Sequence, residues 1–109
     1  MKLAIIGSRN LQMENIDEYI PNHVNEIVSG GARGIDSLAA EYARRNGIRL
    51  TEFYPNYARF GRGAPLKRNE QIAEYADMAI AFWDGRSRGT LHTIQLVQRK
   101  NKSVTVIQL

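Results

Sequence analysis

The sequence predicts an α/β fold of Rossmann-like type, a three-layer α/β/α sandwich around a five-stranded, mostly parallel sheet. Five short apolar runs alternate with segments that have the character of helices. The runs are continuously apolar rather than alternating, which is typical of strands buried on both faces of a parallel sheet. Because crossovers between parallel strands are right-handed, this alternation indicates a doubly wound sheet, for which we expect the strand order 3-2-1-4-5.

The predicted strands differ in the strength of their apolar signal. The fourth is unbroken from Ala79 to Phe82, and the last is rich in β-branched residues such as Val104 and Val106. The third is the weakest. The predicted strands are Leu3–Gly7, Val24–Ser29, Arg49–Tyr54, Met78–Trp83 and Ser103–Leu109.

The helix after the second strand has the clearest signals. Apolar residues from Ile35 to Ala43 recur at the spacing of one helix face. Arg44 and Arg45 follow in the last turn, where cations suit the helix dipole, and Gly47 supplies a C-terminal stop.

The other connections are less regular. A weak helical segment is expected around Glu14–Ile20. Pro65, a favoured first-turn residue, should begin a helix that runs to about Ala76. A last helix is expected from about Thr90 to Lys100, and Pro55–Ala64 is predicted to be the one longer loop.

Length and composition exclude several classes of protein. The chain has 109 residues and 43% hydrophobic residues, which fits a single globular domain over residues 1–109 and excludes a disordered chain. It has no cysteine, which excludes disulfide frameworks and thiolate metal sites. His23 and His92 lack a suitably spaced second ligand, so no metal site is predicted. The first apolar run is too short for a signal peptide and no membrane span is evident, so we expect a cytoplasmic location.

Glycine, arginine and hydroxyl residues follow four of the predicted strands. The carboxyl ends of parallel strands share one edge of the sheet, where ligands bind in open α/β folds. Glycine permits close backbone approach, helix N-termini bind anions, and arginine recognises phosphate. The candidate ligand- and phosphate-binding residues are Gly7, Ser8, Arg9, Gly30, Gly31, Arg33, Gly34, Asp36, Lys67, Arg68, Asn69, Gly85, Ser87, Gly89 and Thr90.

The basic residues are concentrated at this predicted edge. Lys67 and Arg68 fall in the first turn of a helix, where the dipole disfavours cations, and a bound anion would resolve that conflict. Asp36 and Asp84 are the only acidic residues at the edge, so they are the candidates for acid or base catalysis. Taken singly, the glycine turns, caps and loop charges also fit purely structural roles. The basic residues at this edge are Arg9, Arg33, Arg59, Arg62, Lys67, Arg68, Arg86 and Arg88, eight of the fifteen in the chain.

Three familiar motifs are absent. There is no GxxxxGK[ST], which argues against a P-loop nucleotidase. The first turn reads GSRNLQ rather than GxGxxG, so the usual dinucleotide fingerprint is missing. No G-x-S-x-G elbow is present.

The combination of SGGARGID, KRN and GRSRGT at these spacings resembles the SLOG superfamily of Rossmann-like proteins, which includes DprA/Smf-like and LOG-like members. It is most similar to the YspA branch related to YpsA. The resemblance covers Leu3 to about Ile107 and implies a pocket for a nucleotide or nucleotide-derived ligand. By it, residues from GSR, SGGARGID, KRN and GRSRGT would line that pocket.

The resemblance leaves three functions open. The first is binding of a small nucleotide-type ligand, for sensing or processing, with no further cofactor. The second is hydrolysis of a nucleotide N-glycosidic bond, as in LOG enzymes. Their PGGxGTxxE signature is only partly matched, because Thr93 stands where the glutamate would be, so Asp36 or Asp84 would have to act. The third is single-stranded nucleic-acid binding, as in DprA, with Tyr54, Tyr57 and Phe60 stacking bases and the basic loops contacting phosphates. A homodimer is compatible with each.

Overall fold

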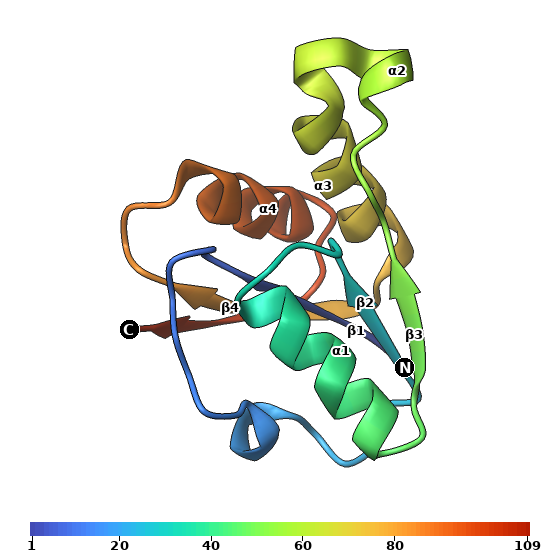
Figure 1. The fold of residues 1–109 in the computed structure, drawn as a ribbon, viewed down its shortest axis with the longest axis vertical. Helices are drawn as coiled ribbons and strands as arrows, with labels where there is room; N and C mark the ends of the chain where they lie inside the picture. The colour runs from blue at the N-terminus through green and yellow to red at the C-terminus, as the bar shows by residue number, and fades with distance from the viewer.

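The computed structural model describes residues 1–109 as one five-stranded sheet flanked by helices (Figure 1). The strand order is β3-β2-β1-β4-β5, which confirms the predicted order. All four strand pairs are parallel, so the sheet is entirely parallel. The elements in chain order are β1 (Lys2–Gly7), η1 (Asp17–Tyr19), β2 (Glu26–Ser29), α1 (Ile35–Arg45), β3 (Arg49–Glu52), α2 (Tyr57–Phe60), η2 (Gly61–Gly63), α3 (Ala64–Tyr75), β4 (Met78–Trp83), α4 (Arg88–Arg99) and β5 (Val104–Gln108).

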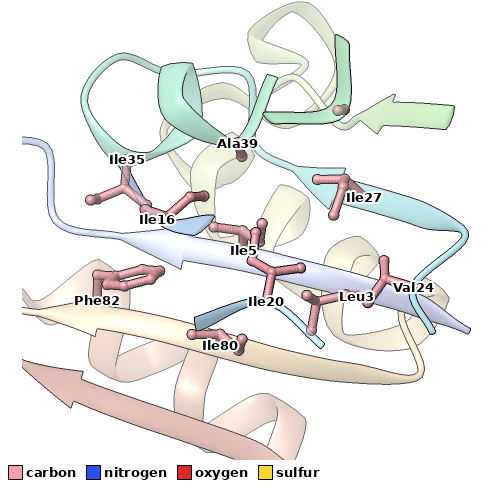
Figure 2. Close-up of a cluster of buried hydrophobic side chains, with 11 residues drawn as sticks. Leu3, Ile5, Ile16, Ile20, Val24, Ile27, Ile35, Ala39, Ile80 and Phe82 are labelled. Carbon is pink, nitrogen blue, oxygen red and sulfur yellow. The ribbon is translucent and has the colours of Figure 1, made fainter. Parts of the chain in front are cut away.

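The two faces of the sheet carry separate hydrophobic cores. Side chains alternate along a strand, so Leu3 and Ile5 pack with α1 and the η1 region, whereas Ala4 and Ile6 pack with α3 and α4. Figure 2 shows the first core, in which Phe82 lies near Ile35 and Ile16. This division gives the three predicted layers, with α1 on one side of the sheet and α3 and α4 on the other.

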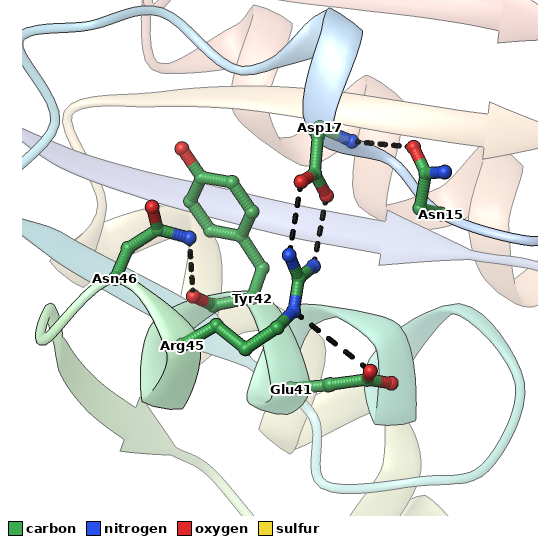
Figure 3. A network of polar contacts seen from close by, with 6 residues as sticks. All are labelled: Asn15, Asp17, Glu41, Tyr42, Arg45 and Asn46. Atoms are coloured by element: carbon green, nitrogen blue, oxygen red, sulfur yellow. Dashed lines mark hydrogen bonds and ion pairs between the residues drawn. The ribbon is translucent and has the colours of Figure 1, made fainter.

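The segment Glu14–Ile20 forms less helix than its pattern suggested. Only one 3₁₀ turn, η1, is present, and Ile20 is extended, with φ −96° and ψ 124°. Pro21 explains this end, because a proline disfavours helical geometry in the residue before it. The turn is held by Asp17, which accepts two hydrogen bonds from the Arg45 guanidinium, of 2.9 and 3.0 Å (Figure 3).

The predicted loop Pro55–Ala64 is mostly helical, so that prediction was wrong. Asn56 caps the short helix α2 by accepting a hydrogen bond from the Arg59 N–H at 3.1 Å. Gly61, at φ 56°, ends α2 and leads into η2. This segment carries Arg59 and Arg62 at exposed positions. An asparagine cap was the signal that could have revealed the helix.

Helix α4 begins two residues before the predicted start. Ser87 is its N-cap, and the Ser87 hydroxyl accepts a hydrogen bond from the Thr90 N–H at 3.3 Å. A turn of four residues, 84–87, joins the end of β4 to the first turn of α4. No helix in the molecule combines the length and hydropathy needed to cross a bilayer.

Candidate functional site

A cavity of about 390 Å³ opens at the carboxyl ends of the strands, between the starts of α1, α3 and α4. Its volume lies within the range of about 300–1,000 Å³ that small-ligand pockets occupy. The loops after β1, β2 and β4 and the first turns of α3 and α4 supply its walls. The lining residues are Ile6, Gly7, Arg9, Asn10, Gly30, Ala32, Asp36, Pro65, Leu66, Arg68, Asn69, Ile72, Ser87, Gly89, Thr90 and Thr93.

The structure brings most of the predicted site residues to this cavity and leaves others outside. Nine line it: Gly7, Arg9, Gly30, Asp36, Arg68, Asn69, Ser87, Gly89 and Thr90. Six do not: Ser8, Gly31, Arg33, Gly34, Lys67 and Gly85. Seven further residues line the cavity without having been predicted as site residues: Ile6, Asn10, Ala32, Pro65, Leu66, Ile72 and Thr93. Asn10 could have been found, since it directly follows the GSR turn.

Two of the predicted glycines are needed for packing. A Cβ on Gly7 would lie 2.4 Å from Ile35 Cγ1, so β1 and the start of α1 can meet only at a glycine. Gly34 has φ 75°, and a Cβ there would lie 2.9 Å from the carbonyl oxygen of Arg9. These glycines bring α1 against the end of β1, which closes one side of the cavity.

Two amides of the glycine turn after β2 are paired within the protein. The Ala32 N–H donates to Asp36 Oδ2 at 3.0 Å, and the Gly31 N–H donates to the Ser29 hydroxyl at 3.3 Å. Asp36 therefore occupies the position that an external anion would take at this turn. Burial raises the pKa of the Asp36 carboxyl, against the lowering effects of the Ala32 N–H and the Arg68 charge. Ser29 and Asp36 thus reduce the number of free amides in this turn, which remains a predicted anion-binding segment.

Arg68 crosses from α3 to the end of β2. Its Nη1 donates to the Gly30 carbonyl at 2.8 Å, and its Nε donates to Asn69 Oδ1 at 3.0 Å. No hydrogen bond within the protein engages Nη2, so the guanidinium is held in place with donors still free. Burial lowers the pKa of Arg68, Asp36 opposes that effect, and Arg9 adds to it. Arg9 and Arg68 both line the cavity, so it holds two guanidinium groups.

The neighbouring Lys67 behaves differently. It is exposed and forms an ion pair with Glu70, with 3.3 Å between Nζ and Oε2. The unfavourable position of Lys67 near the start of α3 is therefore offset by an acidic side chain of the same helix, and no anion is needed. Of the two residues, only Arg68 faces the cavity.

The start of α4 offers an open backbone amide. Thr90 donates its N–H to the Ser87 cap, but no hydrogen bond within the protein engages the N–H of Gly89, which lines the cavity. Ser8 is buried, and its hydroxyl lies 3.3 Å from the Thr90 hydroxyl, which ties β1 to this helix. The first turn of α4 is thus fixed and presents positive dipole to the cavity.

Asp84 serves the turn before α4. Its Oδ1 accepts hydrogen bonds from the N–H groups of Ser87 at 2.7 Å and Arg86 at 2.8 Å, and these bonds lower the pKa of Asp84. It does not line the cavity. Of the two catalytic candidates, Asp36 alone does. Thr93 is buried at the position of the LOG glutamate and donates its hydroxyl to the Gly89 carbonyl at 3.0 Å.

The charges at the cavity are fewer than the sequence suggested. Arg9 and Arg68 are its only basic residues, and Asp36 is its only acidic residue. The arrangement suits an anion between the Gly89 amide and the two guanidinium groups. The basic residues that the structure leaves outside are Arg33, Arg59, Arg62, Lys67, Arg86 and Arg88.

Comparison with known proteins gave one family and one curated relative. Residues 1–60 match the family described as YAcAr, the YspA, cpYpsA-related SLOG family. Over 79 residues the chain is 37% identical to the Gene 61 protein of Mycobacterium phage D29. This alignment covers 67% of the chain and 63% of the phage protein, so the chain spans less than two thirds of that relative. No solved structure matches the chain.

Proposed function

This chain belongs to the YspA, cpYpsA-related SLOG family, and on that premise we propose that it binds a nucleotide or nucleotide-derived phosphate ligand in the cavity at the carboxyl edge of its sheet. The family match confirms the resemblance over residues 1–60, which hold the GSR and SGGARGID motifs, and it suggests a nucleotide-related function. The ligand and the residues that hold it are the proposal.

One observation carries the proposal. Arg9, Arg68 and the open N–H of Gly89 come from three segments distant in the sequence and line one cavity. Each of the three has at least one N–H donor that no group in the protein engages, which leaves these donors available for an anion. Charge-assisted hydrogen bonds of this kind are shorter and stronger than neutral ones. The phosphate is therefore expected near the start of α4.

A thermal-shift titration tests this binding. We expect AMP, ADP, ADP-ribose or NAD at millimolar concentration to raise Tm in a saturable way. At a ligand concentration of 100 times Kd, the free energy of unfolding should increase by about 2.7 kcal/mol. Arg9→Ala should remove most of the shift, because it removes a guanidinium that we expect to contact the phosphate. The Arg9 side chain has no other hydrogen bond in the protein, so the variant should keep its fold. Arg33→Ala is the matched control, an exposed arginine outside the cavity. Absence of any shift across this panel would refute the proposal.

Asp36 favours a second candidate, hydrolysis of a nucleotide at its N-glycosidic bond. The residue lines the cavity and burial raises its pKa, which is the property of a general acid. Released free base from the same nucleotides would be measured by chromatography. Turnover that is lost in Asp36→Asn would support hydrolysis, whereas binding without turnover by the unaltered protein would exclude it for these nucleotides.

A further inference from the structure

Exposed apolar side chains gather around the mouth of the candidate site. The chain has five large hydrophobic residues that are strongly exposed, and three of them, Tyr54, Tyr57 and Leu66, lie between the end of β3 and the first turn of α3. Leu66 is 50% exposed and lines the cavity. The other two, Val106 and Leu109, lie at the β5 end of the chain. Three of the five exposed hydrophobic residues thus come from the segment of the chain that leads into the cavity-lining start of α3.

Tyr54 is held in place although it is 61% exposed. Its ring packs on Gly31 so closely that a Cβ there would lie 2.2 Å from Tyr54 Cε1. Its hydroxyl donates to Glu52 Oε1 at 2.7 Å. Gly31 lies between Gly30 and Ala32, both of which line the cavity. The ring is therefore fixed beside the rim, with much of its surface open to solvent.

Tyr57 begins α2, a short helix that contacts α3, the helix that carries Leu66 and Arg68. It is 59% exposed. Neither tyrosine is among the residues that line the cavity. The two tyrosines therefore provide exposed aromatic surface outside the cavity that holds Arg9 and Arg68.

This inference rests on the proposed function: we propose that Tyr54 and Tyr57, with Leu66, form a stacking platform for the base of a nucleotide whose phosphate lies at Arg9, Arg68 and Gly89. The ligand class is then a phosphate ester that carries a planar aromatic base, and a purine should bind better than a pyrimidine. Sugar phosphates and inorganic phosphate would occupy only the charged part of the site.

Two features favour a base over other occupants. A nucleotide joins an anionic end to a flat apolar end, and the site presents two guanidinium groups in the cavity and the exposed ring of Tyr54 against Gly31 beside it. Tyrosine also supplies contact area at low entropy cost, because it has only two side-chain torsions, and the Glu52 hydrogen bond already restrains Tyr54. Base stacking on such rings tolerates different bases, which suits a site without an evident base-specific donor.

Isothermal titration with AMP, UMP and ribose 5-phosphate tests the platform. We expect the intact protein to bind AMP more tightly than UMP, and UMP more tightly than ribose 5-phosphate. Tyr57→Ala and Tyr54→Ala should each weaken AMP binding by about tenfold, within the range known for base–aromatic stacking, and leave ribose 5-phosphate binding unchanged. Tyr57→Phe keeps the ring and should retain the affinity for AMP.

The outcomes separate this inference from the proposed function. Equal affinity for AMP and ribose 5-phosphate would refute the platform while leaving phosphate binding intact. Binding of neither compound would refute both. Light scattering on the same variants identifies a competing occupant: if Tyr57→Ala abolishes a dimer and leaves the AMP to ribose 5-phosphate ratio unchanged, the surface contacts a second copy and the platform is wrong.

Discussion

Replacing Arg68 separates its structural role from its role in binding. Arg68→Ala removes the hydrogen bonds to the Gly30 carbonyl at 2.8 Å and to Asn69 Oδ1 at 3.0 Å. At about 0.5–1.5 kcal/mol net for each, the expected loss of stability is about 1–3 kcal/mol. In a domain of this size, this loss corresponds to a fall in Tm of several degrees. The variant should still fold.

The loss in binding free energy is expected to be similar in size to the loss in stability. A guanidinium that donates to phosphate contributes about 1.5–3 kcal/mol, so the Kd for AMP should rise by about 10- to 150-fold. Arg68→Lys keeps the charge but loses the planar fork, and it should recover only part of the affinity. Calorimetry well below the Tm of each variant, with folding checked by circular dichroism, measures both effects.

Lys67→Ala is the matched control, since it removes a positive charge one residue away on the same helix but outside the cavity. It should leave the Kd for AMP nearly unchanged. If Arg68→Ala lowers Tm but binds AMP with the Kd of the unaltered protein, then Arg68 serves the fold alone and the reasoning about the site is refuted. Equal losses in Lys67→Ala and Arg68→Ala would show that general electrostatic attraction, not the cavity, explains the binding.

Three further predictions concern stability. Gly7→Ala should destabilise the fold by about 1–3 kcal/mol in urea denaturation, because its Cβ would lie 2.4 Å from Ile35 Cγ1, whereas Gly63→Ala meets no atom within 4 Å and should not. Burial raises the pKa of Asp36 above 3.8, so ionisation of this carboxyl destabilises the folded state. Its ionisation therefore lowers the free energy of unfolding as pH rises above 3.8. The Tm of Asp36→Asn relative to the unaltered protein should therefore increase from about pH 3 to about pH 7, and a constant difference would contradict this. Ser87→Ala should cost about 1 kcal/mol in thermal unfolding by removing the cap of α4, and an unchanged Tm would show that the cap contributes little.

The sequence predicted the strands and their order more completely than it predicted the structure of two connecting segments. Continuous apolar runs such as Met78–Trp83 match β4 at both ends, because burial on both faces demands that pattern. Glu14–Ile20 and Pro55–Ala64 were misjudged for opposite reasons. Pro21 ends the first after a single turn, whereas the Asn56 cap starts a helix in the second. In each segment the apolar periodicity was weak, and a single residue, Pro21 or Asn56, decided whether a helix formed.

At the candidate site, the sequence determined which loops meet, because the carboxyl ends of parallel strands lie along one edge whatever the loops contain. It could not determine which donors in those loops stay free. The tertiary structure decided that Asp36 takes the Ala32 amide, that Glu70 pairs with Lys67, and that Arg68 turns toward Gly30. A backbone amide or a guanidinium is open to a ligand only if no nearer acceptor reaches it first. Which acceptors are near is settled by packing in three dimensions, and the order of residues along the chain does not contain that information directly.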